Sequence, residues 1–239
     1  MFSQAIELYL KKNGFDTFRP KAVLFDMDGV LFDSMPLHAK SWAKVSADFG
    51  LHMTPEDVYM YEGRTGFATI NLLAEHYWKR SATDEEVEKI YEEKCRLFNA
   101  YPKAPKMAGA DDVLAKVEAA GLQALVVTGS GQASLLNRLE TNYPGHFPIE
   151  RVVSSKDVKF GKPHPEPYLM GLEKAGVQPW EAIVVENAPL GVRAGVAAQI
   201  FTVAVNTGPL ADDVLLQEGA NWLFPSMSAF AEQIDQLIR

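Results

Sequence analysis

The chain has 239 residues, 47% of them hydrophobic and 23% charged, a globular composition that excludes a disordered or collagen-like chain. Its 31 acidic and 23 basic residues give a net charge of -8, which argues against a general nucleic-acid binder, because such proteins need a basic face. The single cysteine, Cys95, excludes an internal disulfide and favours a reducing compartment.

The N-terminal segment predicts a short amphipathic helix over residues 4–12, followed by a linker that ends at Pro20. Lys11 and Lys12 come after the apolar stretch, whereas a signal peptide carries its basic residues before it. No apolar run in the chain approaches the ~20 residues that a membrane helix requires. We therefore expect a cytoplasmic protein without membrane or nucleic-acid partners, and we expect a monomer.

Short apolar runs then alternate with helical segments. The run at 22–25 is apolar on both faces, which is typical of a buried strand in a parallel sheet. Similar runs lie at 124–127, 183–185 and 201–205, with a weaker one at 151–153. Helical patterns that end at Gly121 and Gly176 separate some of these strands. This alternation predicts an α/β fold with a doubly wound, Rossmann-like parallel sheet.

Residues 36–102 interrupt this alternation with helical patterns alone. Thr54 and Thr83 each begin a helix with a capping residue followed by acidic residues. We therefore predict a helical-bundle cap inserted after the first strand of the core. The predicted units are an N-terminal helix and linker over residues 1–20, a core made of residues 21–35 and 103–239, and the cap over residues 36–102.

Two carboxylates, Asp26 and Asp28, follow the first predicted strand, at the edge of the sheet where open α/β folds bind their ligands. Carboxylates this close repel each other unless a cation or a proton lies between them. A divalent cation with oxygen ligands would satisfy them, and Mg²⁺ is the common choice where phosphate is also bound. The alternative is an ordinary turn after a strand, since Asp-x-Asp-Gly is also turn chemistry.

Polar groups follow two further strand ends. Thr128, Gly129 and Ser130 come after the 124–127 strand, where backbone N–H groups at a helix start can cradle a phosphoryl group. The alternative for this segment is a simple helix cap. Glu186 and Asn187 end the 183–185 strand and add two oxygen donors.

Lys162 directly precedes Pro163, with Pro165 two residues further on, in a loop that follows the weak strand at 151–153. A lysine held in a rigid loop is suited to neutralising an anion, whereas an isolated lysine is usually solvated. The four strand ends thus offer carboxylates, hydroxyl groups, a lysine and a further carboxylate in turn. Together these groups predict a site for a metal ion and a phosphate.

These motifs, taken in order, resemble the four motifs of the haloacid dehalogenase superfamily. The helical insertion after the first motif is similar to the cap of the branch that contains β-phosphoglucomutase and phosphoglycolate phosphatase. The residues that carry the resemblance are Asp26-x-Asp28-Gly29-Val30, Thr128-Gly129-Ser130, Lys162-Pro163 and Glu186-Asn187.

The resemblance implies a covalent mechanism. Asp26 would be the nucleophile that forms an aspartyl-phosphate, and Asp28 would be the general acid and base. Thr128 and Lys162 would hold the phosphoryl oxygens, together with the Gly129-Ser130 segment.

The same resemblance implies a Mg²⁺ site made of Asp26, the backbone carbonyl of Asp28, and Glu186 or Asn187. Many relatives have Glu-Asp where this chain has Glu186-Asn187. An amide lowers the negative charge of the site by one, so we expect weaker Mg²⁺ binding.

The cap loop Tyr61–Gly66 is expected to set specificity, since its glycines suit a loop that closes over the core. The β-phosphoglucomutase pattern has a basic residue directly before the matching glycine Gly63 and an arginine three places after it. This chain has Glu62 and Gly66 at those positions, and Arg64 is the basic residue that could compensate. We hypothesise that Glu62 reaches the metal on closure, so that the site fits a very small substrate. The alternative is that Glu62 pairs with Arg64 on the cap surface.

The leading interpretation is a Mg²⁺-dependent phosphohydrolase that acts on a small phosphorylated substrate, with inorganic pyrophosphate as the first candidate. The alternatives are a β-phosphoglucomutase, a sugar-phosphate phosphatase, or an inactive phosphate-binding regulatory module. At the hinge, His38 could orient the substrate or Asp28, and its alternative role is packing.

Overall fold

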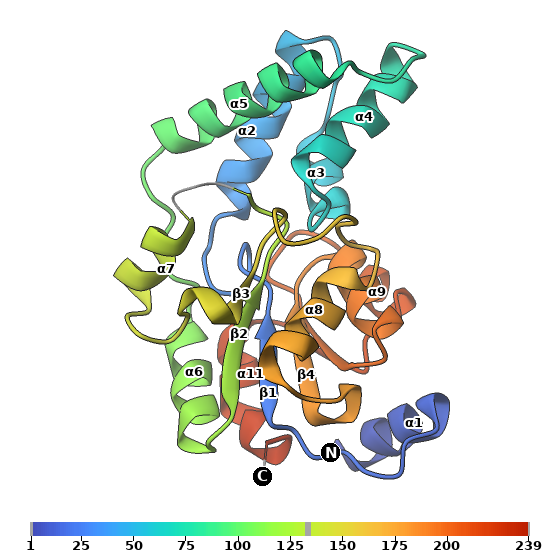
Figure 1. Ribbon diagram of the computed structural model, residues 1–239, viewed down its shortest axis with the longest axis vertical. Helices are drawn as coiled ribbons and strands as arrows, with labels where there is room; N and C mark the ends of the chain where they lie inside the picture. Colours follow the sequence, from blue (N-terminus) through green and yellow to red (C-terminus); the bar gives the residue numbers. More distant parts are fainter. Residues whose placement is uncertain (1, 132–134, 239) are drawn as a thin grey trace.

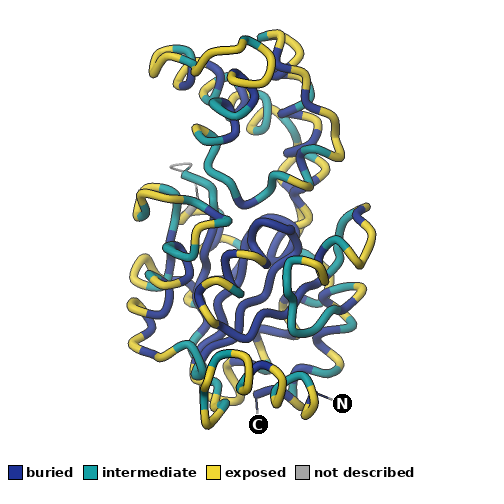
Figure 2. The backbone as a smooth tube through the Cα atoms, turned by 90° about the vertical axis from the view of Figure 1, so that its right-hand side faces the viewer, coloured by how far each residue is buried: buried dark blue, intermediate teal, exposed yellow. Residues whose placement is uncertain are grey.

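The computed structural model describes residues 2–131 and 135–238. Figure 1 shows a sheet with flanking helices and, above one end of the sheet, a separate group of helices. Both ends of the described chain lie at the opposite end of the sheet. Figure 2 shows the same arrangement from the side, with buried backbone concentrated in the sheet and exposed backbone on the outer helices.

The six strands are all parallel and have the order β3-β2-β1-β4-β5-β6. They are β1 (Ala22–Phe25), β2 (Gln123–Val127), β3 (Val152–Val153), β4 (Ala182–Glu186), β5 (Phe201–Val205) and β6 (Trp222–Phe224). The chain winds to one side of β1 first and then returns to build the other side. This confirms the predicted doubly wound core and places a topological switch point beside β1, where such sheets bind ligands.

Strand β1 has buried side chains on both faces, which explains its continuous apolar run. Val23 and Phe25 pack into one apolar cluster, and Ala22 and Leu24 into the cluster on the other face. Since helices cover both faces, every side chain of the strand leaves water, and full burial of a Val, Leu or Phe side chain contributes ~1.5–3 kcal/mol.

The helices divide between these two faces. Helices α1 (Ser3–Asn13), α6 (Ala110–Ala119), α7 (Leu135–Asn142) and α11 (Met227–Gln233) pack on the face of Phe25. Helices α8 (Glu166–Ala175) and α9 (Pro189–Ala197) cover the face of Leu24. The remaining short helices are α10 (Asp212–Gln217) and the 3-10 turns Ile149–Arg151, Pro179–Glu181 and Ile234–Gln236.

The helical cap consists of α2 (Met35–Asp48), α3 (Pro55–Tyr61), α4 (Gly66–Tyr77) and α5 (Asp84–Ala100). Thr54 and Thr83 begin α3 and α5 with complete capping boxes, as the sequence predicted. The cap has its own apolar cluster, which includes Val45, Ile70 and Ile90. Within the described residues, no helix combines the length and the apolar character needed to cross a bilayer.

We keep the unit boundaries given above as a proposal. The proposed units are 1–20 for the N-terminal helix and linker, 21–35 with 103–239 for the core, and 36–102 for the cap. Residues 1, 132–134 and 239 of these ranges lie outside the described residues.

Two glycines flank α6, and substitutions at these two positions test how closely the start of this helix packs against the backbone at Ser228. Both have left-handed backbone, with φ of +88° at Gly109 and +72° at Gly121. A Cβ on Gly109 would lie 2.5 Å from the backbone N of Ser228, whereas nothing lies within 4 Å of a Cβ on Gly121.

We expect Gly121→Ala to lower the free energy of unfolding by about 1 kcal/mol, the strain of left-handed backbone alone. Gly109→Ala should lower it by about 1–3 kcal/mol more, because backbone must also move. Urea unfolding of the two variants measures the difference, and equal losses would contradict the packing of α6 against Ser228.

Candidate active site

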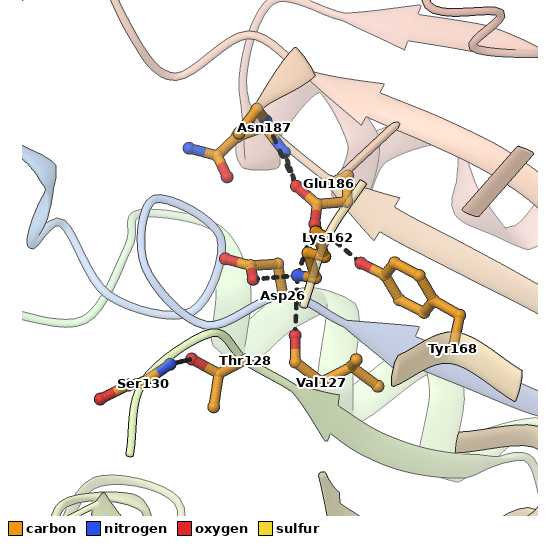
Figure 3. A network of polar contacts seen from close by, with 9 residues as sticks. Asp26, Val127, Thr128, Ser130, Lys162, Tyr168, Glu186 and Asn187 are labelled. Carbon is orange, nitrogen blue, oxygen red and sulfur yellow. Dashed lines mark hydrogen bonds and ion pairs between the residues drawn. The ribbon is translucent and has the colours of Figure 1, made fainter. Parts of the chain in front are cut away.

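The polar residues predicted to act together lie at one edge of the sheet. Phe25 pairs with Val126 of β2 and with Val185 of β4, so the residues that follow these strands share an edge. Asp26 follows β1, Thr128 follows β2, and Glu186 ends β4, and all three are buried. Figure 3 shows a network in which Asp26 and Glu186 are joined through Lys162, while Thr128 is joined separately to Ser130.

Lys162 is the centre of this network. Its Nζ donates to Asp26 Oδ1 at 2.5 Å, to Glu186 Oε1 at 2.7 Å and to the Val127 carbonyl at 2.9 Å. Burial by itself would lower the pKa of Lys162, but the two carboxylates outweigh it and hold the pKa above its ordinary value. The ammonium therefore remains charged inside the protein.

Both carboxylate oxygens of Glu186 are already occupied. Oε1 accepts from Lys162 and from the Tyr168 hydroxyl at 2.8 Å. Oε2 accepts from the backbone N–H groups of Asn187 at 2.9 Å and Ala188 at 3.2 Å. This carboxylate anchors the lysine, and it has little capacity left for a metal ion.

Two other oxygens of the site, Asp26 Oδ2 and Asn187 Oδ1, are buried and make no hydrogen bond to any described residue. Figure 3 shows the Asn187 amide on the same side of the network as the Asp26 carboxylate. Gly29 allows this position, because a Cβ there would lie 2.0 Å from Asn187 Nδ2.

These donors fit a hard cation. No group of three or more His, Cys, Asp or Glu side chains in the described part of the chain is arranged to hold a metal. A carboxylate and an amide oxygen instead match Mg²⁺, which binds few protein ligands and keeps waters. Burial raises the pKa of Asp26, Lys162 opposes this shift, and nearby Glu186, Asp28 and Glu62 add to it. A bound cation would relieve this excess of carboxylates.

Asp28 has a separate set of partners. Its Oδ1 accepts from the Ser34 hydroxyl at 2.5 Å and lies 3.2 Å from His38 Nε2 and 3.6 Å from Arg138 Nη1. On the other side of the imidazole, Lys94 Nζ lies 2.9 Å from His38 Nδ1. A lysine ammonium can only donate, which assigns the accepting role to Nδ1 and the imidazole proton to Nε2, on the side of Asp28, although Nε2 makes no hydrogen bond to a described residue.

His38 therefore contacts Asp28 and is not a packing residue alone. Burial and the neighbouring Lys94 lower the pKa of His38, so the imidazole is neutral. Burial also lowers the pKa of Lys94, which is enclosed by the rings of Trp42 and Phe98. Sequence reasoning missed Lys94, although a lysine on the apolar stripe of a predicted helix is a detectable signal.

The Thr128-Gly129-Ser130 segment forms a tight turn beside the cap. Thr128 Oγ1 accepts from the Ser130 backbone N–H at 3.1 Å. A Cβ on Gly129 would lie 2.9 Å from the carbonyl oxygen of Gly63, so the cap loop touches this turn.

The cap loop joins α3 to α4 and brings Glu62 and Arg64 to the core. Burial and the nearby Asp28 raise the pKa of Glu62 to about 7, although Lys94 opposes this shift. Among the described residues, no ion pair joins Glu62 to Arg64, and Arg64 Nε is buried without a partner. The structure therefore does not contain the surface pair that was the alternative for Glu62.

Two cavities lie beside Asp28, His38 and Ser130. The smaller, of about 30 Å³, is polar, and its cap wall includes Glu62, Arg64 and Lys94. The larger, of about 230 Å³, lies at the hinge and is lined by α7 and by the segment that leads from α5 back to the core.

Two buried tyrosines test the contribution of the Glu186 anchor to stability. Tyr168 donates to a carboxylate, whereas the Tyr143 hydroxyl donates to the neutral carbonyl of Leu31 at 2.5 Å. A hydrogen bond to a charged group is worth ~1.5–3 kcal/mol and a neutral one ~0.5–1.5 kcal/mol. We therefore expect Tyr168→Phe to lower the unfolding free energy more than Tyr143→Phe. The reverse order in urea unfolding would contradict the charged anchor.

Comparison with known proteins agrees with this geometry. The family model described as haloacid dehalogenase-like hydrolase matches residues 23–205. The chain is 31% identical to hexitol phosphatase A of Escherichia coli over 191 residues, covering 79% of this chain and 84% of that protein. It is 30% identical to a phosphorylated carbohydrates phosphatase of Thermotoga maritima over 202 residues, covering 84% and 92% of the two chains.

A similar solved structure is that of a Bacteroides vulgatus protein provisionally named a β-phosphoglucomutase. It is 55% identical, has a TM-score of 0.96, and the match covers 99% of this chain and 96% of that one. These names describe phosphatases and a mutase of phosphorylated carbohydrates, and none of them mentions pyrophosphate. The chain belongs to the haloacid dehalogenase-like hydrolase family, in the branch that includes β-phosphoglucomutase-like proteins.

Proposed function

We propose that this protein is a Mg²⁺-dependent phosphohydrolase that transfers the phosphoryl group of a small substrate to Asp26 and then to water. The observation that carries this proposal is the contact of 2.5 Å between Lys162 and Asp26, beside an oxygen of Asp26 that has no partner. A charged lysine next to a carboxylate nucleophile can hold a phosphoryl oxygen during attack.

In the first step, a carboxylate oxygen of Asp26 bonds to phosphorus while the bond from phosphorus to the leaving oxygen breaks. Asp28 passes to the leaving oxygen a proton taken up from solvent, because burial raises its pKa but the contacts with His38, Arg138 and Ser34 outweigh this and keep the resting carboxyl ionised. In the second step, Asp28 accepts a proton from water, whose oxygen attacks phosphorus and releases phosphate and the free Asp26 carboxylate. His38 and Ser34 hold Asp28 in place through the contacts described above.

We assign the phosphoryl-binding role to Thr128, Gly129, Ser130 and Lys162. For the metal, we favour Asp26, Asn187 and the backbone carbonyl of Asp28, while Glu186 serves as the anchor of the lysine. Bound Mg²⁺ would supply charge neutralisation for the transferring group.

For the substrate, we propose inorganic pyrophosphate. The polar cavity of about 30 Å³ leaves little room for a sugar, and its lining places Glu62 near the core carboxylates. A carboxylate here faces an anionic substrate unfavourably unless a cation lies between them. Glu62 would therefore contact the metal, directly or through a water, when the cap is closed.

The second candidate is a phosphatase or mutase of sugar phosphates. Hexitol and carbohydrate phosphatases are among the relatives, and the hinge cavity of about 230 Å³ beside Asp28 has room for an organic group. An inactive regulatory module is disfavoured, because Asp26 and Asp28 are both present.

A phosphate-release assay separates these functions. We expect faster cleavage of pyrophosphate than of glucose 6-phosphate or phosphoglycolate, and little conversion of β-glucose 1-phosphate to the 6-phosphate. Asp26→Asn should reduce the activity by roughly ten-thousand-fold. Faster isomerisation of β-glucose 1-phosphate would favour the mutase, and equal activity of the wild type and Asp26→Asn would support the regulatory module.

The role of Glu62 predicts a pH dependence. Since the pKa of Glu62 is raised to about 7, the group becomes protonated as the pH falls below that value and can no longer attract a cation. The Mg²⁺ concentration for half-maximal activity should therefore rise as the pH falls from about 8 to about 6, a range of about one unit on each side of that pKa.

Glu62→Gln should raise this Mg²⁺ requirement at least about tenfold at the higher pH and remove most of its pH dependence. Glu56→Gln, at an exposed position of α3, is the control and should behave as the wild type. An unchanged Mg²⁺ requirement in Glu62→Gln would exclude a metal contact of Glu62.

A further inference from the structure

The cap and the core touch through glycines on both sides. A Cβ on Gly63 of the cap loop would lie 2.8 Å from Lys162 Cδ. On the core side, a Cβ on Gly161 would lie 2.7 Å from Thr65 Cγ2, closer than the ~3.5–4.0 Å at which carbon atoms pack. The absence of side chains at these positions lets the two parts approach this closely.

Gly161 and Thr65 have no part in the proposed chemistry. The backbone of Gly161 lies outside the left-handed region, so alanine could adopt its conformation without strain. Thr65 begins α4, and its Oγ1 accepts from the Ala68 backbone N–H at 3.2 Å. The methyl group of Thr65 therefore serves this cap-to-core contact and not the helix cap.

The contact adjoins the small polar cavity. The cavity wall contains Glu62 and Arg64 from the loop that leads into Thr65, and Gly129 from the core. At about 30 Å³, the space is enough for about two or three waters, since a water needs ~10–15 Å³. Any movement of the cap away from the core would enlarge it.

We propose that the contact between Gly161 and Thr65 is a specificity determinant, which limits the leaving group by fixing how far the cap closes. With glycine at position 161, the polar cavity under the closed cap favours a leaving group about the size of phosphate over a hexose. This inference rests on the proposed phosphohydrolase function and deepens it by assigning the size limit to a contact outside the catalytic residues.

The first test is Gly161→Ala. The new methyl group would hold the cap about 1 Å further from the core, because the two carbons cannot remain 2.7 Å apart. A displacement of this size can cost about 100-fold in rate for a substrate that needs full closure. We expect kcat/KM for pyrophosphate to fall about 100-fold and kcat/KM for glucose 6-phosphate to change less than about threefold.

The second test is the double variant Gly161→Ala with Thr65→Ser. Serine keeps the hydroxyl that caps α4 and removes the methyl group that meets the new Cβ. We expect this variant to recover most of the ratio of kcat/KM for pyrophosphate to that for glucose 6-phosphate, and Thr65→Ser alone to resemble the wild type. Equal losses on both substrates, or no recovery in the double variant, would overturn the proposal.

A third variant covers the case in which Gly161→Ala does not fold. Thr65→Asn keeps a side chain that can cap the helix and adds bulk from the cap side, away from the loop that carries Lys162. It should shift the same ratio in the same direction, and an unchanged ratio would overturn the proposal. If the wild type cleaves no pyrophosphate, the proposed substrate is wrong, but the ratio of phosphoglycolate to glucose 6-phosphate activity still tests the contact.

Discussion

The arrangement of the site depends on one buried group of charges, in which Lys162 lies between Asp26 and Glu186. A buried charge that loses its partner is strongly destabilising, so each member holds the others in place. Because the same ammonium also binds the Val127 carbonyl, it ties the ends of three neighbouring strands together. It uses one oxygen of Asp26 for this and leaves the other without a partner. The oxygen proposed to react is therefore left free by the same contacts that hold the edge of the sheet.

The cap is joined to this edge through Asp28 as well as through its linkers. Ser34 precedes the first cap helix and His38 lies in that helix, and both contact the Asp28 side chain. Lys94 comes from the last cap helix and reaches Asp28 only through His38. A displacement of the cap would break this chain of contacts at His38. The orientation of Asp28 is thus coupled to the position of the cap. Closure of the cap would therefore also position the carboxylate that we propose for proton transfer.

The sequence predicted most of the core because its signals are local. Apolar runs such as 22–25 have no other explanation than a strand buried on both faces, and polar residues at their ends meet once the strands are parallel. Strand β6 was missed because its three residues, two half-buried and one buried, are too short a run at a sheet edge to give a pattern. The division of roles between Glu186 and Asn187 was also beyond the sequence, since it depends on which oxygens Lys162 and Tyr168 already occupy. Lys94 was hidden because its partner His38 is 56 residues away.

The names of the relatives indicate phosphorylated carbohydrates, whereas the small polar cavity favours a smaller substrate. Relatives that share a reaction can differ in substrate, because different parts of the fold carry the two properties. The groups proposed to act on phosphorus come from the ends of strands of the sheet, the part of the fold that defines the family. The groups that face the leaving group come from the cap loop, where this chain carries Glu62 and where Gly161 and Thr65 bring it close to the core. A change of a few residues in that loop can alter the substrate without disturbing Asp26 or Lys162. Similarity in the core therefore predicts the type of reaction, whereas the residues of the cap loop determine which substrate fits.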